Sequence, residues 1–159
     1  MGCWLVRAMS VGETRDRRVF GTRVLQRIAE LLPGTPVGFF SDGRQLVHPR
    51  RDAIEAAAVG RVLDAWYAPH VGDLLATLAI ADGRIERRLS ALERDGRLRL
   101  MGISPMFVGD PVFRPDRSDV AEVVDVAGVA SLDLVSRPAG VGCCVLRSWR
   151  EGERECPVT

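Results

Sequence analysis

The sequence contains no lysine, and all 22 of its permanently basic side chains are arginine. A lysine amine is the reacting group in Schiff-base enzymes and the base in Ser-Lys dyads, so both mechanisms are excluded. The chain also has little excess charge, because its 21 acidic residues leave a net charge of +1. Nucleic-acid binding proteins need a basic field, and we therefore expect no nucleic-acid partner.

Cysteine and long apolar runs are also scarce. Cys3, Cys143, Cys144 and Cys156 do not form the C-x2-C pairs of a zinc site, so we expect no metal. A largely apolar chain without a secretory signal is typical of a reducing cytoplasm, where disulfides are rare. The longest apolar runs, such as Leu74 to Ala81, are too short to cross a bilayer, and we expect no membrane partner.

The composition is that of a folded domain. Of the 159 residues, 47% are apolar and 27% charged, which argues against disorder and provides enough apolar material for one core. We expect a single domain over residues 1–147, followed by a charged, flexible tail over residues 148–159.

Hydrophobic periodicity predicts more strand than helix. The fold class expected is α+β, with a mainly antiparallel, barrel-like core flanked by helices. Helices are predicted over residues 19–32 and 85–92, and a charged loop over residues 11–18. Strands are predicted over residues 3–6, 36–40, 59–67 and 73–81, the last two forming a hairpin, and two more in 120–135, broken at 127–128.

The stretch from Arg97 to Val108 is the first candidate for chemistry. Arg97 to Met101 alternates charged and apolar residues, which predicts a strand with one solvated face. Gly102 and Pro105 then interrupt the pattern, so we expect Ser104 where strand pairing ends. A hydroxyl at such a position is a plausible nucleophile, although most such segments are turns.

A serine nucleophile needs a base, and imidazole suits that role at neutral pH. The chain has two histidines. His48 lies between an apolar run and a proline, in Leu-Val-His-Pro. His70 lies in the predicted hairpin turn, and we expect it to be exposed.

The order of several short motifs resembles a known family. His48-Pro49 is followed by the Val59–Val62 hairpin strand, by a helix, by Gly102-Ile103-Ser104, and by an apolar run from Val129 to Ala139. This order, from about residue 12 to residue 140, resembles the prohead serine proteases that mature the capsids of tailed bacteriophages. Those enzymes share their fold with the assemblin proteases of herpesviruses.

The resemblance implies roles for particular residues. His48 becomes the general base and Ser104 the nucleophile, and the third member should come from the strand over residues 129–135. Prohead proteases often have a glutamate, and assemblins a histidine, where this chain has Ser131. Another branch has an aspartate where this chain has Asp133.

Ser131 and Asp133 are two residues apart and so face the same side of a strand. We prefer Asp133 and keep Ser131 as the alternative, because an acidic side chain in an apolar run needs a partner. A carboxylate that only caps backbone N–H groups is the competing interpretation of Asp133. Asp125 is a weaker candidate for the same role.

The tetrahedral intermediate of acyl transfer needs donors for its oxyanion. The resemblance points to Arg137, or to the backbone N–H groups of residues 137–140. An arginine that serves only as surface charge is the alternative.

The function expected is a serine endopeptidase that cleaves capsid and scaffold proteins inside the immature capsid, in the host cytoplasm. Self-association is left open, and no cofactor or metal is implied. A first alternative is a catalytically inactive prohead structural module of the same fold. A second is an unrelated β-rich binding domain, in which His48 and Ser104 never meet.

Overall fold

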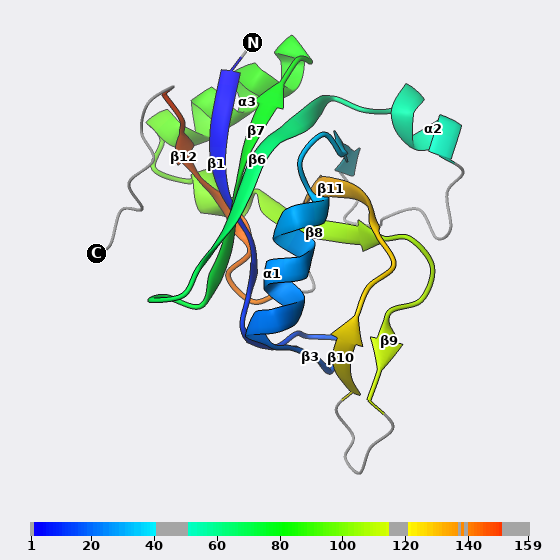
Figure 1. The fold of residues 1–159 in the computed structure, drawn as a ribbon. Coiled ribbons are helices and arrows are strands. Elements are labelled where there is room, and N and C mark those ends of the chain that lie inside the picture. Colours follow the sequence, from blue (N-terminus) through cyan, green and yellow to red (C-terminus); the bar gives the residue numbers. More distant parts are fainter. Residues whose placement is uncertain (1, 41–50, 115–120, 137, 139, 151–159) are drawn as a thin grey trace.

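The computed structural model describes residues 2–40, 51–114, 121–136, 138 and 140–150 (Figure 1). The α+β class is confirmed: strands from both halves of the chain form two sheets, and helices lie against them. The helices are α1 (Thr22–Leu31), α2 (Arg51–Ala56), α3 (Gly83–Arg94) and a 3-10 turn (Leu98–Leu100). In the described part of the chain, no helix is long and apolar enough to cross a membrane.

The larger sheet has eight strands in the order β4-β6-β7-β1-β12-β8-β11-β5. Neighbours are antiparallel except β5, which runs parallel to β11. The two strands at the ends of this order, β4 and β5, are consecutive in the chain and are separated only by Gly38. The bounds are β1 (Gly2–Ser10), β4 (Pro36–Val37), β5 (Phe39–Phe40), β6 (Gly60–Ala68), β7 (Asp73–Ile80), β8 (Gly102–Phe107), β11 (Val129–Val135) and β12 (Cys144–Ser148).

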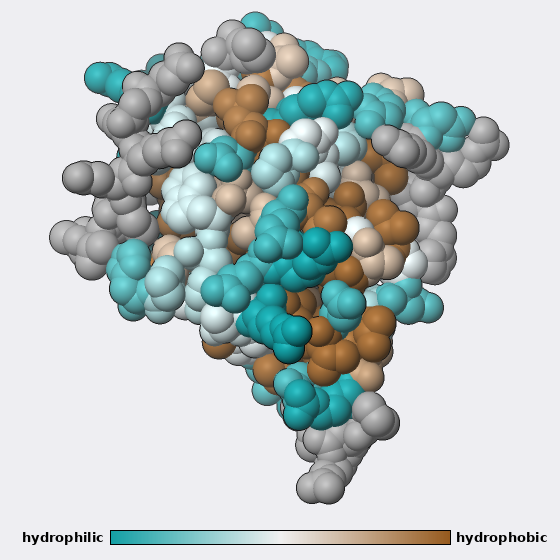
Figure 2. Space-filling model, in the orientation of Figure 1, coloured by the Kyte–Doolittle hydropathy of each residue, from teal (hydrophilic) through white to brown (hydrophobic). Residues whose placement is uncertain are grey.

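The smaller sheet has the order β2-β3-β10-β9 and lies at the lower right of Figure 1. Its strands are β2 (Gly12–Glu13), β3 (Arg18–Phe20), β9 (Val112–Phe113) and β10 (Ala121–Asp125). Phe20 is almost fully buried and sits opposite Val123 in the parallel pair β3–β10. Figure 2 shows apolar side chains at the surface of this region, where Val112 and Phe113 are exposed.

Helix α1 packs against β6 and β7 through an apolar stripe. Val24, Leu25, Ile28 and Ala29 recur at helical spacing and are buried. The opposite face of the helix is hydrophilic, and it forms the teal band across the middle of Figure 2. The predicted stripe is thus confirmed, but the helix starts at Thr22 rather than at residue 19.

The predicted hairpin is confirmed as β6–β7, with Gly60 opposite Ile80 and Ala68 opposite Asp73. The predicted helix over residues 85–92 is confirmed as α3 and starts two residues earlier. The Asp82 side chain caps it by accepting hydrogen bonds from the N–H groups of Arg84 and Ile85. The pKa of Asp82 is lowered to about 2, chiefly by the side-chain hydrogen bond from Arg84.

Three predictions about the positions of strands are wrong. Residues 97–101 are not a strand, because α3 ends at Arg94, Gly96 then turns the chain in a left-handed conformation, and residues 98–100 form the 3-10 turn. Strand β8 begins at Gly102, so Ser104 lies within the paired region rather than at its end. Residues 11–18, predicted as a loop, contain β2 and the start of β3. Alternation over five residues does not distinguish a strand from a tight helical turn.

Candidate functional site

Ser104 and Asp133 are directly opposed on the neighbouring antiparallel strands β8 and β11. The adjacent pair, Ile103 and Leu134, is fully buried in the main core. Because side chains alternate along a strand, Ser104 and Asp133 share the face opposite to that core. Both are nearly inaccessible, with exposed fractions of 7% for Ser104 and 1% for Asp133. A hydroxyl and a carboxylate are thus held together in a largely desolvated place.

The Asp133 carboxylate is oriented by hydrogen bonds from two sides. Oδ1 accepts a 3.1 Å bond from the backbone N–H of Gly38, and Oδ2 accepts a 3.0 Å bond from the Ser131 hydroxyl. The Gly38 bond agrees with the interpretation of Asp133 as a carboxylate that accepts backbone N–H groups. An oriented carboxylate is also what an imidazole partner requires, so the two interpretations are compatible.

Gly38 is needed for this geometry. A Cβ atom at this position would lie 2.5 Å from Asp133 Oδ1, closer than atoms without a bond between them approach. The Gly38 carbonyl in turn accepts a 2.9 Å bond from the N–H of Leu134, so Gly38 is bonded both to the Asp133 side chain and to the backbone of the next residue. Gly38 was not among the predicted site residues, and the signal for it was a single glycine inside the apolar run from Pro36 to Phe40.

The two candidates for a third catalytic residue act as one unit. Ser131 is 1% exposed and donates to Asp133, as their shared strand face predicted. The Ser131 hydroxyl both donates and accepts hydrogen bonds, whereas the ionised carboxylate of Asp133 only accepts them. It is therefore the better acceptor for an imidazole N–H, and Ser131 supports it.

A pocket of about 140 Å³ adjoins Ser104. One wall comes from β8, and the others come from the end of β1, from residues 14–20 and from Gly140. Phe20 and Phe107 both line the pocket, and their rings stack with centroids 6.0 Å apart. The lining residues are Ala8, Met9, Thr14, Asp16, Arg18, Phe20, Ser104, Pro105, Phe107 and Gly140.

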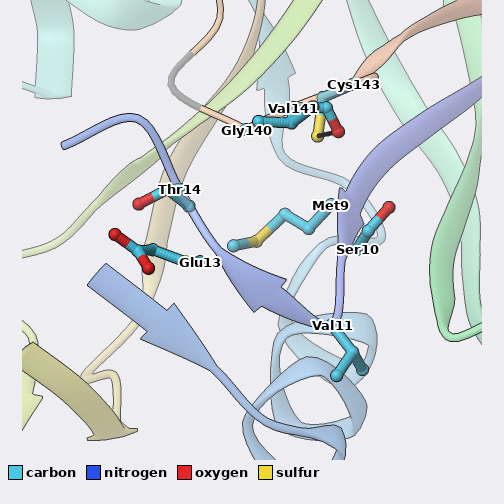
Figure 3. Close-up of a pocket in the computed structure, with 8 residues that line it drawn as sticks. All are labelled: Met9, Ser10, Val11, Glu13, Thr14, Gly140, Val141 and Cys143. Carbon is cyan, nitrogen blue, oxygen red and sulfur yellow. Dashed lines mark hydrogen bonds between the residues drawn. The ribbon is translucent and has the colours of Figure 1, made fainter. Parts of the chain in front are cut away.

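A second pocket, of about 60 Å³, shares Met9, Thr14 and Gly140 with the first. Figure 3 shows the Met9 side chain reaching from β1 toward Thr14, below the segment that carries Gly140 and Cys143. The two pockets therefore meet along Met9, and a thioether side chain forms part of the wall of both.

A partly buried ionic network holds the loop that contains Gly140. Arg7 Nε pairs with Asp73 Oδ2 at 2.8 Å, and the Ser10 hydroxyl donates to Asp73 Oδ1 at 2.7 Å. Arg7 also donates a 3.3 Å bond to the carbonyl of Gly142. The Asp73 carboxylate thus joins β1 to β7, and the Arg7 guanidinium joins both to the 140–143 loop.

The described cysteines, Cys3, Cys143 and Cys144, are free thiols. Burial, with a further contribution from Cys144, raises the pKa of Cys143 to about 12, and burial also raises the pKa of Cys144. Such thiols are not thiolates at neutral pH and are therefore poor nucleophiles. The described residues include no cluster of three side chains suited to hold a metal ion.

The remaining predicted site residues divide into two groups. His48 and Arg137 lie outside the described residues, so their roles stay predictions. His70 is exposed in the β6–β7 turn, as expected. Asp125 is exposed at the end of β10 in the smaller sheet, where its side chain accepts a 2.8 Å bond from the N–H of Val126. The structure therefore gives Asp125 no link to Ser104.

No family model, no curated protein and no solved structure matches this chain. What the protein does is therefore inferred from the surroundings of Ser104 and from the order of motifs in the sequence.

Proposed function

We propose that this protein is a serine endopeptidase of the prohead-maturation type, with Ser104 as nucleophile, His48 as general base and Asp133 as the third residue. The observation that carries the proposal is the direct opposition of Ser104 and Asp133 across β8–β11, where both are buried and Ser104 lines a pocket. A carboxylate held by the Gly38 N–H and the Ser131 hydroxyl is suited to orient an imidazole.

The ends of the segment that carries His48 support its assignment. Phe40, just before that segment, sits opposite Val135 on β11, and α2, just after it, contacts β11 as well. His48 is three residues from Arg51, a reach of at most about 11 Å. The segment thus leaves and rejoins the described chain beside the strand of Asp133.

The barrel-like core expected from the sequence belongs to the same proposal. Within residues 36–40, β4 pairs with β6 and β5 pairs with β11. Strands β6 and β11 are the second strand from each end of the eight-stranded sheet, so one short segment pairs near both of its ends. A curved sheet that meets itself at Gly38 accounts for both pairings. It also accounts for a glycine N–H beside Asp133.

In the proposed reaction, the Ser104 oxygen attacks the peptide carbonyl carbon while His48 takes the serine proton. The tetrahedral intermediate collapses, the C–N bond breaks, and the imidazolium of His48 gives its proton to the leaving amine. A water molecule then attacks the acyl-enzyme, loses a proton through His48, and releases a carboxylic acid and free Ser104. This sequence needs no metal or redox cofactor.

The oxyanion would be stabilised by Arg137 or by N–H groups of residues 137–140. Gly140 supports this assignment, because it lines the same pocket as Ser104. The proposed substrates are capsid and scaffold proteins, and the proposed place of action is the immature capsid in the host cytoplasm. These proposals rest on the motif order described for the sequence.

The experiment is labelling with a broad fluorophosphonate, read by intact and peptide mass spectrometry. An activated serine forms an O–P bond and releases fluoride, and its proton passes to the base. We expect one label, at Ser104, and no label in Ser104→Ala or His48→Ala. Matched controls are Ser90→Ala and His70→Ala, which remove an exposed serine on α3 and the other histidine, and both should label like the wild type.

Labelling that persists in His48→Ala would remove His48 as base. A folded wild-type chain that takes no label would favour the inactive module of the same fold. Labelled protein that cleaves no capsid or scaffold polypeptide would leave a serine hydrolase with a different substrate.

A further inference from the structure

The pocket beside Ser104 has an apolar interior. Ala8, Met9 and Phe20 are each at most 5% exposed and belong to the main core. Phe107 stacks on Phe20 and packs against the same core. Pro105, next to Ser104, completes the apolar part of the lining.

The charged side chains of the pocket neutralise each other at its rim. Arg18 Nε lies 3.3 Å from Asp16 Oδ2, and the Thr14 hydroxyl donates to the same carboxylate. The side chains of Arg18 and Asp16 are 38% and 46% exposed, so they lie toward solvent rather than in the interior. The Arg18 guanidinium also lies 5.5 Å from the ring centroid of Phe113. A charged ligand entering this pocket would lose water without gaining an uncompensated opposite charge.

The size of the pocket restricts the ligand further. Its volume is about 140 Å³, close to that of an engineered apolar cavity of about 150 Å³ that holds benzene. A side chain of the size of leucine, methionine or phenylalanine fits this space, and alanine would leave most of it empty. Met9 gives the wall some adaptability, because an unbranched thioether side chain adjusts its rotamer at low cost.

We propose that this pocket is the primary specificity pocket of the enzyme, and that it selects an uncharged apolar residue of leucine to phenylalanine size on the acyl side of the cleaved bond. The inference rests on the proposed function of Ser104. A pocket adjoining the nucleophile receives the side chain of the residue whose carbonyl is attacked. The substrates would therefore be polypeptides cut after Leu, Met or Phe in an exposed segment.

The test uses a series of N-acyl aminoacyl diphenyl phosphonates that differ only in the side chain: Ala, Leu, Phe, Trp, Asp and Arg. Inactivation joins the Ser104 oxygen to phosphorus and releases phenol, which carries away the serine proton. The rate constants are measured by intact mass spectrometry. We expect the Leu and Phe reagents to react at least tenfold faster than the Ala, Asp and Arg reagents.

Two variants with opposite effects test the pocket itself. Ala8→Val adds two methyl groups to its wall and should shift the preference from Phe toward Ala. Phe107→Ala enlarges the pocket and should raise the rate of the Trp reagent relative to Leu. Ala127→Val, the same chemical change at an exposed loop position, is the control and should leave the ratios unchanged. Circular dichroism of each variant establishes that it is folded.

The outcomes separate the two proposals. If Ser104 reacts at similar rates with all the reagents, or prefers Asp or Arg, the assignment of Ser104 as nucleophile is kept and the proposed specificity pocket is overturned. If neither these reagents nor the broad fluorophosphonate modify Ser104 in folded protein, the proposed function fails and the pocket assignment fails with it. If one variant does not fold, the ratio measured in the other still decides, because the two variants predict opposite shifts.

Discussion

The backbone N–H of Gly38 donates a 3.1 Å hydrogen bond to Oδ1 of Asp133, although the two residues are 95 positions apart in the chain. The bond joins the turning point between β4 and β5 to the strand that faces Ser104. It makes the orientation of a buried carboxylate depend on a residue that carries no side chain.

Gly38→Ala tests this dependence directly. The added methyl group would lie 2.5 Å from Asp133 Oδ1 and 3.0 Å from the ring of Phe40, so either the carboxylate or the chain must move. We expect the free energy of unfolding to fall by about 1–3 kcal/mol, the range for an overpacked core site. We also expect Ser104 to react at least tenfold more slowly with the fluorophosphonate. Urea denaturation and labelling rates measure the two effects.

Gly83→Ala is the matched control. Gly83 is the first residue of α3, and its added Cβ would meet only the Arg87 guanidinium, at an ordinary 3.5 Å. Alanine in a helix is more stable than glycine by about 0.4–1 kcal/mol, so this variant should be slightly stabilised and react normally. Equal behaviour of the two variants would show that Gly38 has no special role.

Replacing Asp133 separates structure from chemistry. Asp133→Asn keeps an oxygen that can accept the Gly38 N–H, and the Ser131 hydroxyl can rotate to accept from the new amide. We expect it to fold nearly as stably as the wild type but to label about 10²–10⁴ times more slowly, because the negative charge that stabilises an imidazolium is lost. Asp133→Ala should in addition lose about 1–3 kcal/mol of stability, because two buried donors lose their acceptor.

Ser131→Ala distinguishes the two candidates for the third residue. If Asp133 is the third residue, deletion of the Ser131 hydroxyl removes one of its supporting bonds but leaves its charge and its bond from Gly38, and we expect a decrease in labelling rate of about tenfold. A larger decrease in Ser131→Ala than in Asp133→Asn would assign the role to Ser131 instead.

The carboxylate of Asp73 should contribute strongly to stability. It accepts from Arg7 and from Ser10, and its side chain is only 12% exposed. We expect Asp73→Ala to lower the free energy of unfolding by about 1.5–3 kcal/mol, and Ser10→Ala by about 1 kcal/mol. Chemical denaturation measures both, and a double-mutant cycle with Arg7→Met gives the coupling energy.

The surface pair Arg27–Glu30 is the reference for that measurement. Its side chains are 49% and 68% exposed and lie one helical turn apart on α1. Deleting Glu30 should change stability by no more than about 0.5 kcal/mol. A cost for Asp73→Ala as small as this would show that the network around Arg7 is incidental.

The raised pKa of Cys143 predicts a decrease in stability at high pH. The folded-state pKa is about 12, against 9.0 for an ordinary thiol, so between pH 9 and 12 the unfolded chain loses a proton that the folded chain keeps. The unfolded state then binds fewer protons, and stability falls as the pH rises through this window, with no contribution below it. Urea denaturation at pH 8, 9, 10 and 11 measures the slope.

Cys143→Ala should reduce this slope. Cys144 shifts in the same direction and leaves a residual slope. An unchanged slope in Cys143→Ala would mean that the thiol is reached by water in the folded protein.

The sequence predicted the elements with long patterns. The apolar stripe of α1 was predicted from its helical period, and the hairpin β6–β7 from two long runs on either side of turn residues. The short elements were not predicted. Strand β3 is three residues long, and Phe20 is in it because its ring is buried against Phe107, which no local pattern reveals.

The site was predicted in part, and for a similar reason. Ser131 and Asp133 share a strand face, as the period of two requires, and they contact each other. That Ser104 lies opposite Asp133 depends on the register of β8 and β11, which pairs residues 29 positions apart. The role of Gly38 depends on a contact over 95 positions, and sequence spacing alone does not indicate it.

The position of β1 has a consequence for synthesis on the ribosome. This strand, the earliest described element in the sequence, pairs with β7 on one side and with β12, near the other end of the described chain, on its other side. Strand β12 in turn pairs with β8, which carries Ser104. At typical elongation rates of about 5–20 residues per second, several seconds pass between the emergence of β7 and that of β12. Until β12 is made, the edge of β8 that pairs with it stays open, so the catalytic surroundings proposed for Ser104 are complete only when translation has passed residue 148.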